Sequence, residues 1–509
     1  MSRARTIMFQ GTASDVGKSV LTTAFCRILV QDGFKTAPYK SQNMALNSYV
    51  TLCGKEIGRA QGVQAEACGI AATTDMNPIL IKPTRDMSAQ VVVHGKPHAE
   101  MSAWRYREEY LPVAETIVRE ALDRLRSAYD VVVIEGAGSP AEINLKDRDI
   151  VNMRLAGWAD APVILVADID RGGVFASIVG TLELLEDHER SRVKGFIINK
   201  FRGDLAILQP GLDWLEQRTG LPVLGVIPYL KDIGIEAEDS VVLEHKASSE
   251  KSDAELDVAV IRLPRISNFT DTDPLLYEPD VKVRYVENPD ELGNPDVILI
   301  PGTKNTLADL RTIREVGLEK AIRAQVLQGA RLVGLCGGYQ MLGEKLSDPE
   351  QVESEEGETL GLGYLPMETV FYPDKRTERV RGIVACSHPD WTELEGMPVE
   401  GYEIHMGRTA VREYAKSLFD FSGQKEGVIS ADGKIWGTYV HGIFENDAFR
   451  RSWLNRIRQD KGLPPIDNGI CFRHRKKAAF DRLADHVRSH LDIREVYRIT
   501  GLCPDMLDA

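Results

Sequence analysis

The sequence has 509 residues and carries 62 Lys and Arg against 76 Asp and Glu, for a formal net charge of −14. A chain of this length exceeds what one hydrophobic core usually serves, so we expect two or three domains. The acidic balance disfavours a nucleic-acid partner, because proteins that bind DNA or RNA normally carry a basic surplus. No apolar run approaches the roughly 20 residues that span a bilayer, so we expect no membrane partner.

Seven cysteines are scattered along the chain without a Cys-x-x-Cys pair. This spacing argues against a disulfide scaffold and against a structural zinc or iron–sulfur site. Free thiols suit a reducing compartment. The N-terminal Met1–Arg5 runs directly into a strand-like stretch and lacks the apolar core of a signal peptide. We therefore expect a cytoplasmic protein.

Short apolar runs rich in Val and Ile alternate with longer helical patterns in the first half of the chain. Runs that are apolar throughout predict strands buried on both faces, as in a parallel sheet with helical crossovers. We therefore predict an α/β domain with a parallel sheet over residues 1–236. Its candidate strands are Thr6–Gln10, Val131–Glu135, Pro162–Asp168, Val193–Asn199 and Pro222–Ile227.

Polar residues dominate positions 237–255, which is typical of an interdomain linker. A second alternating series follows, so we predict a second α/β domain over residues 256–455. The charged, helical pattern of residues 456–509 predicts a C-terminal extension. The candidate strands of the second domain begin at Leu256 and continue over Val281–Val286, Asp296–Ile300 and Arg331–Leu335.

A glycine-rich loop between the first strand and an amphipathic helix predicts a phosphate-binding site for ATP. Its ends are Gly11 and Gly17, followed by Lys18 and Ser19. Glycines let backbone N–H groups turn toward an anion, and the helix N-terminus adds partial positive charge. Lys18 would reach the outer phosphates and Ser19 would ligate Mg²⁺. Five residues separate the glycines where the usual motif has four, and the regular count starts at Thr12.

Polar residues at the ends of other strands are candidates for the same site, because parallel sheets bind ligands at their carboxyl ends. Glu135 follows four apolar residues and is the candidate second Mg²⁺ ligand. Asn199 is a candidate for reading adenine, and Asp168 and Asp170 for holding metal or orienting substrate. Asn199, Asp168 and Asp170 could equally serve a loop or a cap.

The Gly11–Ser19 loop and the segment Glu135-Gly-Ala-Gly resemble the dethiobiotin synthetase group of P-loop enzymes. That resemblance covers most of the first domain. It implies that ATP phosphorylates a carboxylate, or a carbamate, of the substrate.

Cys336 ends an apolar strand and is followed by two glycines and a helix. Such a sharp turn projects a nucleophile into a cleft, and the helix N-terminus stabilises a thiolate. The N–H of Gly337 is then placed to bind a developing oxyanion. These features predict a catalytic rather than an inert cysteine.

A catalytic thiolate needs a histidine that accepts and returns a proton. His441 ends a strand-like stretch downstream and is the preferred candidate. His405 is a rival, because strand alternation places it on one face with Glu403. His388 is a second rival.

The segments around Cys336 and His441 resemble class I glutamine amidotransferase domains, and Gly302 resembles the second part of their oxyanion site. The resemblance implies that Cys336 attacks the amide of glutamine and releases ammonia. Members of that class usually carry His-x-Glu, but Ile443 stands where the Glu would be. The third catalytic residue is therefore missing or supplied from elsewhere, for example by Glu403 or Glu445.

The two domains together resemble the cobyrinate amidotransferases of corrinoid biosynthesis. Besides the phosphate loop, the resemblance rests on Tyr39–Ser48, Asp168–Ser177 and Gly401–Gly407. It implies amidation of the b, d, e and g carboxylates of adenosyl-cobyrinic acid a,c-diamide with ATP and glutamine.

Two alternatives remain open at this point. One is an a,c-diamide synthase or another ligase with the same two domains. The other is a regulatory P-loop ATPase with a degenerate glutaminase domain. The sequence leaves the oligomeric state and the corrinoid-binding residues open.

Overall fold

The structure, a computed structural model, describes residues 3–85, 88–231, 233–235, 253–354 and 357–502. The chain forms two compact units. The first unit comprises Met1–Ala45, Lys55–Ile235 and Lys476–Ala509, and the second comprises Leu46–Gly54 and Glu236–Arg475. Most of the linker expected over 237–255 lies outside the described residues.

The first unit is built on a parallel sheet of six strands with the order β12-β11-β10-β1-β9-β2. All five strands predicted for this domain are present. Two of the inner strands, β9 and β10, are buried along their whole length, as their uniform apolarity predicts. The strands are β1 (Arg5–Gly11), β2 (Thr36–Tyr39), β9 (Val131–Glu135), β10 (Val163–Asp168), β11 (Val193–Phe201) and β12 (Val223–Pro228).

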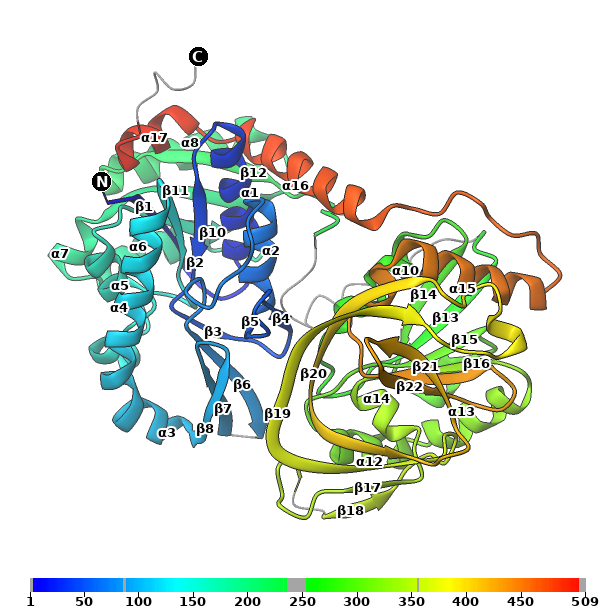
Figure 1. Cartoon of the computed structure of the whole chain (residues 1–509). Coiled ribbons are helices and arrows are strands. Elements are labelled where there is room, and N and C mark those ends of the chain that lie inside the picture. Colours follow the sequence, from blue (N-terminus) through cyan, green and yellow to red (C-terminus); the bar gives the residue numbers. More distant parts are fainter. Residues whose placement is uncertain (1–2, 86–87, 232, 236–252, 355–356, 503–509) are drawn as a thin grey trace. The chain divides into compact units, whose positions relative to one another are not determined.

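Helices cover both faces of this sheet (Figure 1). On one face, Phe25 of α1 and Tyr497 of α17 pack in the same apolar cluster as Phe9 of β1. Figure 1 shows α4 and α6 on the opposite side from α1. The helices are α1 (Lys18–Gln31), α2 (Arg59–Ala67), α4 (Leu111–Ala128), α5 (Met153–Ala159), α6 (Val174–Leu184), α7 (Asp187–Arg190), α8 (Leu205–Thr219), α16 (Phe472–Arg488) and α17 (Ile493–Thr500).

A second, four-stranded sheet of the order β3-β6-β7-β8 belongs to the first unit and was not anticipated from the sequence. Its strands are short or partly exposed, so they lack the uniform apolarity of the main sheet. Its elements and their neighbours are β3 (Gln42–Met44), β5 (Glu56–Gly58), β6 (Ile79–Arg85), β7 (Ser88–Val93), β8 (Lys96–Ser102), α3 (Ala103–Arg105), η1 (Tyr106–Tyr110) and η2 (Ile143–Arg148).

The second unit contains an eleven-stranded mixed sheet. Its parallel part has the order β14-β13-β15-β16-β23, and an antiparallel part continues from β22 to β19 and its partner β20. The strands are β13 (Leu256–Ile261), β14 (Val281–Val286), β15 (Val297–Ile300), β16 (Arg331–Leu335), β17 (Lys345–Ser347), β18 (Glu358–Leu360), β19 (Met367–Val384), β20 (Pro398–Val411), β21 (Lys416–Phe421), β22 (Gln424–Ile429) and β23 (Ile435–Thr438).

Two apolar clusters hold the second unit together, one on each face of the parallel strands. One of these clusters contains the buried, edge-to-face indole rings of Trp391, Trp436 and Trp453. The helical elements are η3 (Phe269–Thr272), α10 (Asp273–Tyr277), α11 (Pro289–Leu292), α12 (Thr306–Glu315), α13 (Leu318–Leu327), α14 (Gly337–Met341), η4 (Pro389–Trp391), η5 (Ile443–Glu445) and α15 (Asp447–Asp460). The short strand β4 (Ser48–Val50) also belongs to this unit.

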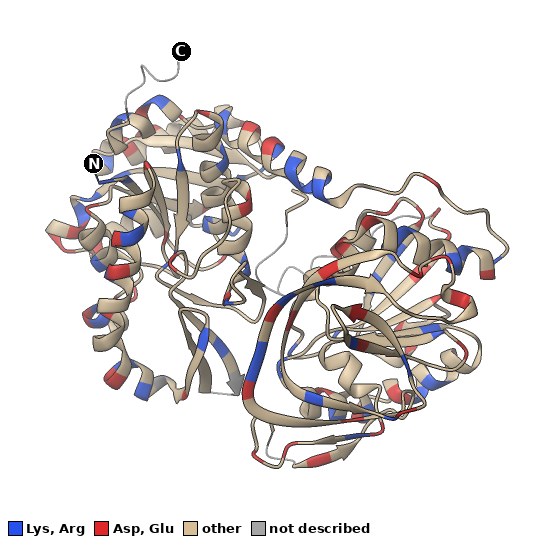
Figure 2. Cartoon of the chain, viewed as in Figure 1, with Lys and Arg blue, Asp and Glu red and all other residues tan. Residues whose placement is uncertain are grey.

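The α/β fold class predicted for both halves is confirmed by these two sheets. Residues 456–509, which we expected as one extension, divide between the units, because the amphipathic helix α17 buries Val496 and Tyr497 in the core of the first unit. Basic and acidic side chains are interspersed over both units (Figure 2). Among the described residues, no helix is both long and apolar enough to cross a membrane.

Candidate active sites

The phosphate loop of the first unit joins β1 to α1. Gly17 caps the helix with a positive φ of 95°, and a side chain at Gly11 would collide with Lys18. The ammonium of Lys18 folds over the loop and donates to the carbonyls of Ala13 and Gly138, at 3.0 and 3.1 Å. Thr12 donates its backbone N–H to Val166 of β10. The loop is therefore closed around a cation, as a phosphate site requires.

Glu135 ends β9 beside this loop and is buried. One carboxylate oxygen accepts from Ser19 at 2.7 Å and from Lys40 at 2.8 Å, and the other accepts from Gln64 at 2.7 Å. Burial alone would raise the pKa of Glu135, but the charge of Lys40 and these hydrogen bonds outweigh it and lower the pKa. Glu135 is thus an anion that is hydrogen-bonded to Ser19, the residue after Lys18.

The other strand-end candidates lie in the same unit but form ion pairs. Asp168 is 2.8 Å from the ammonium of Lys200, and Asp170 is 3.2 Å from Arg202. The amide of Asn199 donates to the carbonyl of Val16 at 2.8 Å and so braces the phosphate loop. The proposed roles of these residues toward metal, substrate or adenine stay predictions.

Cys336 stands between β16 and α14 in a strained turn. Its φ and ψ angles are 49° and −106°, a region that side chains other than glycine rarely adopt. The turn depends on glycine at two neighbours: a Cβ atom on Gly338 would lie 1.9 Å from the carbonyl oxygen of Ile300, and one on Gly334 would lie 2.7 Å from that of Gly338. This geometry matches the nucleophile turn that the sequence predicts.

His441 follows β23, and its orienting acid is Asp271. Atom Nδ1 of His441 lies 2.7 Å from the Asp271 carboxylate, whose other oxygen accepts from the N–H of Gly442 at 2.9 Å. This corrects the expectation that Glu403 or Glu445 supplies the acid. No local sequence pattern marks Asp271 as the partner of His441, because it lies 170 residues upstream in η3.

The environment of His441 favours its charged form. Burial lowers the pKa of the imidazole, but the charges of Asp271 and Cys336 and the hydrogen bond to Asp271 raise it to about 10. The thiol of Cys336 points to the carbonyl of Ile404 at 3.7 Å. Atom Nε2 of His441 has no hydrogen-bond partner among the described residues, so a rotation of the thiol would bring the pair together.

Gly302 and Gly337, the predicted oxyanion residues, both lie close to this pair. A Cβ atom on Gly302 would be 3.3 Å from the imidazole Cε1 of His441. One on Gly337 would be 2.7 Å from the side chain of Thr303, the residue after Gly302. The structure therefore brings both glycines to the site, although their part in oxyanion binding stays a prediction.

The segment Leu46–Gly54 also reaches this site within the second unit. The N–H of Ser48 donates to the side chain of Asn268 at 2.9 Å, and the N–H of Asn268 donates to the side chain of Asn47 at 2.7 Å. Asn268 precedes the η3 turn that carries Asp271. These two hydrogen bonds therefore fix Asn268, where the turn that carries Asp271 begins. Asp271 in turn orients His441.

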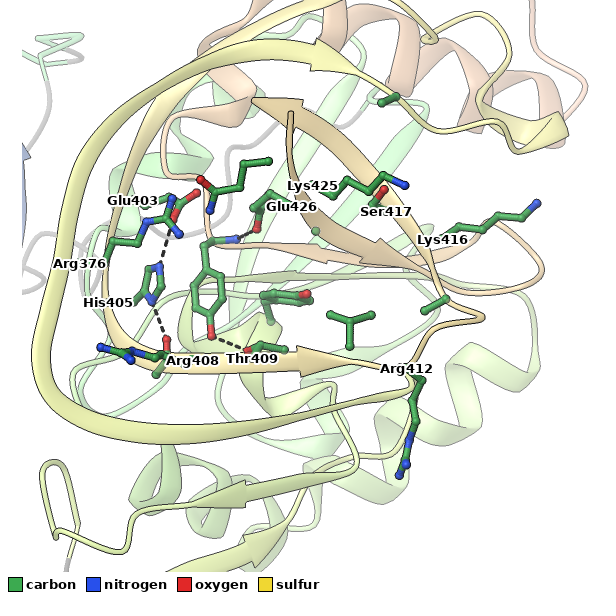
Figure 3. A pocket seen from close by; sticks show the side chains of 18 of the residues that line it. Arg376, Glu403, His405, Arg408, Thr409, Arg412, Lys416, Ser417, Lys425 and Glu426 are labelled. Carbon is green, nitrogen blue, oxygen red and sulfur yellow. Dashed lines mark hydrogen bonds and ion pairs between the residues drawn. The ribbon is translucent and has the colours of Figure 1, made fainter. Parts of the chain in front are cut away.

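Glu403 and His405 line a separate cavity of about 880 Å³ in the second unit (Figure 3). Glu403 pairs with His405 at 3.1 Å and with Arg376 at 3.0 Å, and the ring of His405 stacks on Tyr439 at 3.7 Å. Burial and the charge of Glu403 raise the pKa of nearby Glu426 to about 8. These contacts place Glu403 in a buried network of its own rather than in the pair of His441.

Two further residues were missed by sequence reasoning. Lys40 and Gln64 both contact Glu135. Lys40 follows β2 directly, so its place at the carboxyl end of a parallel strand could have indicated it. Gln64 lies inside α2, where no motif distinguishes it.

Comparison with known proteins agrees with the division of the chain into two different domains. Residues 7–241 match the family described as the CobQ/CobB/MinD/ParA nucleotide binding domain. Residues 257–449 match the CobB/CobQ-like glutamine amidotransferase domain. The predicted pairing of a P-loop nucleotide-binding domain with a glutamine amidotransferase domain is thereby confirmed.

Relatives resemble the chain over almost its whole length. The cobyric acid synthase of Geobacillus kaustophilus (strain HTA426) is 56% identical over 498 residues, which cover 97% of each protein. The cobyric acid synthase of Desulforamulus reducens is 53% identical over 509 residues, which cover 99% of each. That of Dehalococcoides mccartyi (strain ATCC BAA-2266 / KCTC 15142 / 195) is 51% identical over 502 residues, covering 97% of this chain and 98% of that one. This enzyme therefore belongs to the cobyric acid synthase family.

Proposed function

We propose that the enzyme uses ATP and glutamine to amidate the b, d, e and g carboxylates of adenosyl-cobyrinic acid a,c-diamide, giving cobyric acid for cobalamin biosynthesis. Identity above 50% to cobyric acid synthases across both domains is the observation that carries the proposal. The same comparison disfavours an a,c-diamide synthase. The six described cysteines are free, which supports a cytoplasmic setting.

In the first unit, the phosphate loop positions ATP so that a carboxylate of the substrate is phosphorylated. A carboxylate is a poor acyl donor, and phosphorylation gives its carbon a leaving group that ammonia can displace. Lys18 is the candidate for stabilising charge on the transferred phosphoryl group, since its ammonium lies at the loop beside Gly138.

Ser19 and Glu135 are the proposed ligands of Mg²⁺. Their oxygens lie 2.7 Å apart at the loop, and a hydroxyl with a carboxylate is a donor set that Mg²⁺ accepts. Bound there, the ion would neutralise phosphate charge. Lys40 and Gln64 would keep Glu135 ionised and oriented.

In the second unit, Cys336 attacks the side-chain amide of glutamine after His441 takes its thiol proton. His441 then returns that proton to the departing ammonia, and water hydrolyses the thioester. Asp271 positions the imidazole and stabilises its charged form. The N–H groups near Gly302 and Gly337 are the proposed donors to the oxyanion.

Mass spectrometry of the product tests the proposed function. The enzyme is incubated with cobyrinic acid a,c-diamide, ATP, Mg²⁺ and glutamine. Exchange of an acid for an amide lowers the mass by about one unit, so four amidations lower it by about four units. An unchanged corrinoid mass, with ATP hydrolysed, would point instead to a regulatory ATPase.

A further inference from the structure

A cavity of about 810 Å³ lies in the first unit beside the loop that carries Gly138. It is bounded by the four-stranded sheet, by η1 and α4, and by the segment 137–153. Figure 1 shows β7, β8 and α3 together at one end of the unit. Its volume suits a large small-molecule ligand.

One wall of this cavity is the loop that follows Glu135. Gly138, Ser139 and Pro140 line the cavity, and the carbonyl of Gly138 accepts from the ammonium of Lys18 at 3.1 Å. A molecule in the cavity would therefore lie against the same loop that the phosphate-binding lysine contacts. A substrate that receives a phosphoryl group from ATP must lie there.

The remaining walls are mainly apolar. Three large apolar side chains that line the cavity are well exposed: Met44 at 60%, Trp104 at 67% and Leu145 at 51%. Apolar side chains gathered around one cavity are unusual on a protein surface unless a ligand or partner covers them. The cavity is thus suited to a ligand with broad apolar faces.

Polar side chains interrupt these apolar walls, and the charged ones include three carboxylates, Glu142, Asp149 and Glu189. Arg107, Arg148 and Lys146 line the cavity, and each also pairs with a carboxylate of the same unit. Asn152 is buried and lines the cavity, and its side-chain oxygen has no hydrogen-bond partner among the described residues. Its amide nitrogen donates to the carbonyl of Ala137 at 2.7 Å, so the side chain is fixed.

We propose that this cavity binds the corrin macrocycle of the substrate, with the ring faces against Met44, Trp104 and Leu145. The assignment rests on the proposed function. The guanidinium groups of Arg107 and Arg148 would meet peripheral carboxylates, because each has more donors than its present pairs use.

Apolar walls also suit four amidations at one site. The four carboxylates lie around the ring, so each must in turn reach the phosphate loop beside Gly138. A rigid polar clamp would hold one orientation of the ring and exclude the others. Contacts to the ring faces lack that restriction, since apolar burial is non-directional.

Two substitutions test the cavity in the full-length enzyme. Trp104→Ala removes the largest exposed wall, and Ala89→Trp places a bulky side chain in the cavity from β7. Trp214→Ala is the matched control, because Trp214 is also an exposed tryptophan of the first unit but does not line the cavity. Two quantities are measured. Equilibrium dialysis, with the corrinoid detected by its visible absorption, gives the affinity for cobyrinic acid a,c-diamide, and steady-state kinetics give the KM for the same compound.

We expect both cavity variants to weaken corrinoid binding and raise its KM by about tenfold or more, and the control to leave both unchanged. Glutamine hydrolysis should be unaffected in all three. Unchanged binding in both cavity variants, with the unsubstituted enzyme active, would overturn the assignment. A change in sedimentation without a change in KM would also overturn it, since a second copy of the chain would then cover the cavity. Failure of the unsubstituted enzyme to amidate any corrinoid would instead count against the proposed function.

Discussion

The two catalytic turns of this enzyme share one architecture but differ in their backbone. Both connect a buried parallel strand to a helix, at β1 to α1 and at β16 to α14. In the phosphate loop Gly17, at the start of the helix, adopts φ of 95° without cost, and Asp15 adopts φ of 58°, which Asp tolerates better than most residues. In the second turn the left-handed residue is Cys336, which is forced into that region.

The difference follows from what each turn must do. A phosphate loop offers backbone N–H groups and a lysine to a ligand that brings its own charge, so glycine can stand where the helix begins. A nucleophile must carry a side chain at the turn itself, so strain is unavoidable there. Glycine at 334 and 338 removes the collisions that would otherwise forbid the turn. Phosphate binding therefore relies mainly on the backbone of its loop. The attack on glutamine relies on the side chain of Cys336, which is held in a strained turn, and on its partners.

Removal of Lys18 should have the largest effect. Lys18→Ala deletes the cation at the phosphate loop, so synthesis from either glutamine or ammonia should fall by at least about a thousandfold. Glutamine hydrolysis should persist, because its residues lie in the other unit. Lys194→Ala, on the surface of the same unit, is the control. Retained synthesis in Lys18→Ala would show that the loop does not serve the reaction.

Replacement of Asp271 should slow glutamine hydrolysis by about 10³-fold, because the imidazole loses its orienting acid. The charged imidazole is present below its pKa of about 10 and is lost as pH rises through that value. Asp271→Asn removes the charge that raises this pKa, so the alkaline decline in glutaminase rate should move to lower pH.

Glu403→Gln is the matched control for the Asp271 experiment, since Glu403 belongs to the network of His405. It should leave the position of the alkaline decline unchanged. If Glu403→Gln lost more glutaminase activity than Asp271→Asn, the orienting acid would be Glu403.

Loss of Lys40 should destabilise the first unit. Lys40→Met leaves the carboxylate of Glu135 buried without its cation, which costs about 3–5 kcal/mol in the free energy of unfolding. The double variant Lys40→Met with Glu135→Gln removes the stranded charge and should recover most of that loss. Urea unfolding measures the free energy of unfolding of both variants. If the double variant were less stable than Lys40→Met, the pairing of Lys40 with Glu135 would be contradicted.

Glu426 should change the pH dependence of stability rather than the reaction itself. With a folded pKa of about 8 against an ordinary 4.5, Glu426 keeps a proton that the unfolded chain releases. Stability should therefore fall as pH rises from about 4.5 to 8. Glu426→Gln removes this dependence, so its Tm should exceed that of the unsubstituted enzyme near pH 8.5 and match it near pH 4. Equal Tm values at both pH values would argue against a protonated Glu426.

Much of this architecture could be predicted because local patterns specify it. Apolar runs marked most of the parallel strands of both sheets, although β2 was missed, and glycines beside Lys18 and Cys336 marked both turns. The short strands β3 to β8 lack that apolarity, and the antiparallel strands of the second unit lie beyond the predicted series. Asp271 could not be found, because only tertiary folding brings η3 to His441. The same holds for Leu46–Gly54, whose place in the second unit depends on distant contacts.

Cys336→Ala tests the division of labour between the two turns most directly. Corrinoid amidation is measured by mass spectrometry, once with glutamine and once with ammonium as the nitrogen source. We predict that glutamine-dependent amidation is abolished while ammonia-dependent amidation continues at close to the unsubstituted rate. Loss of both activities in a folded variant, or survival of the glutamine-dependent reaction, would contradict the account.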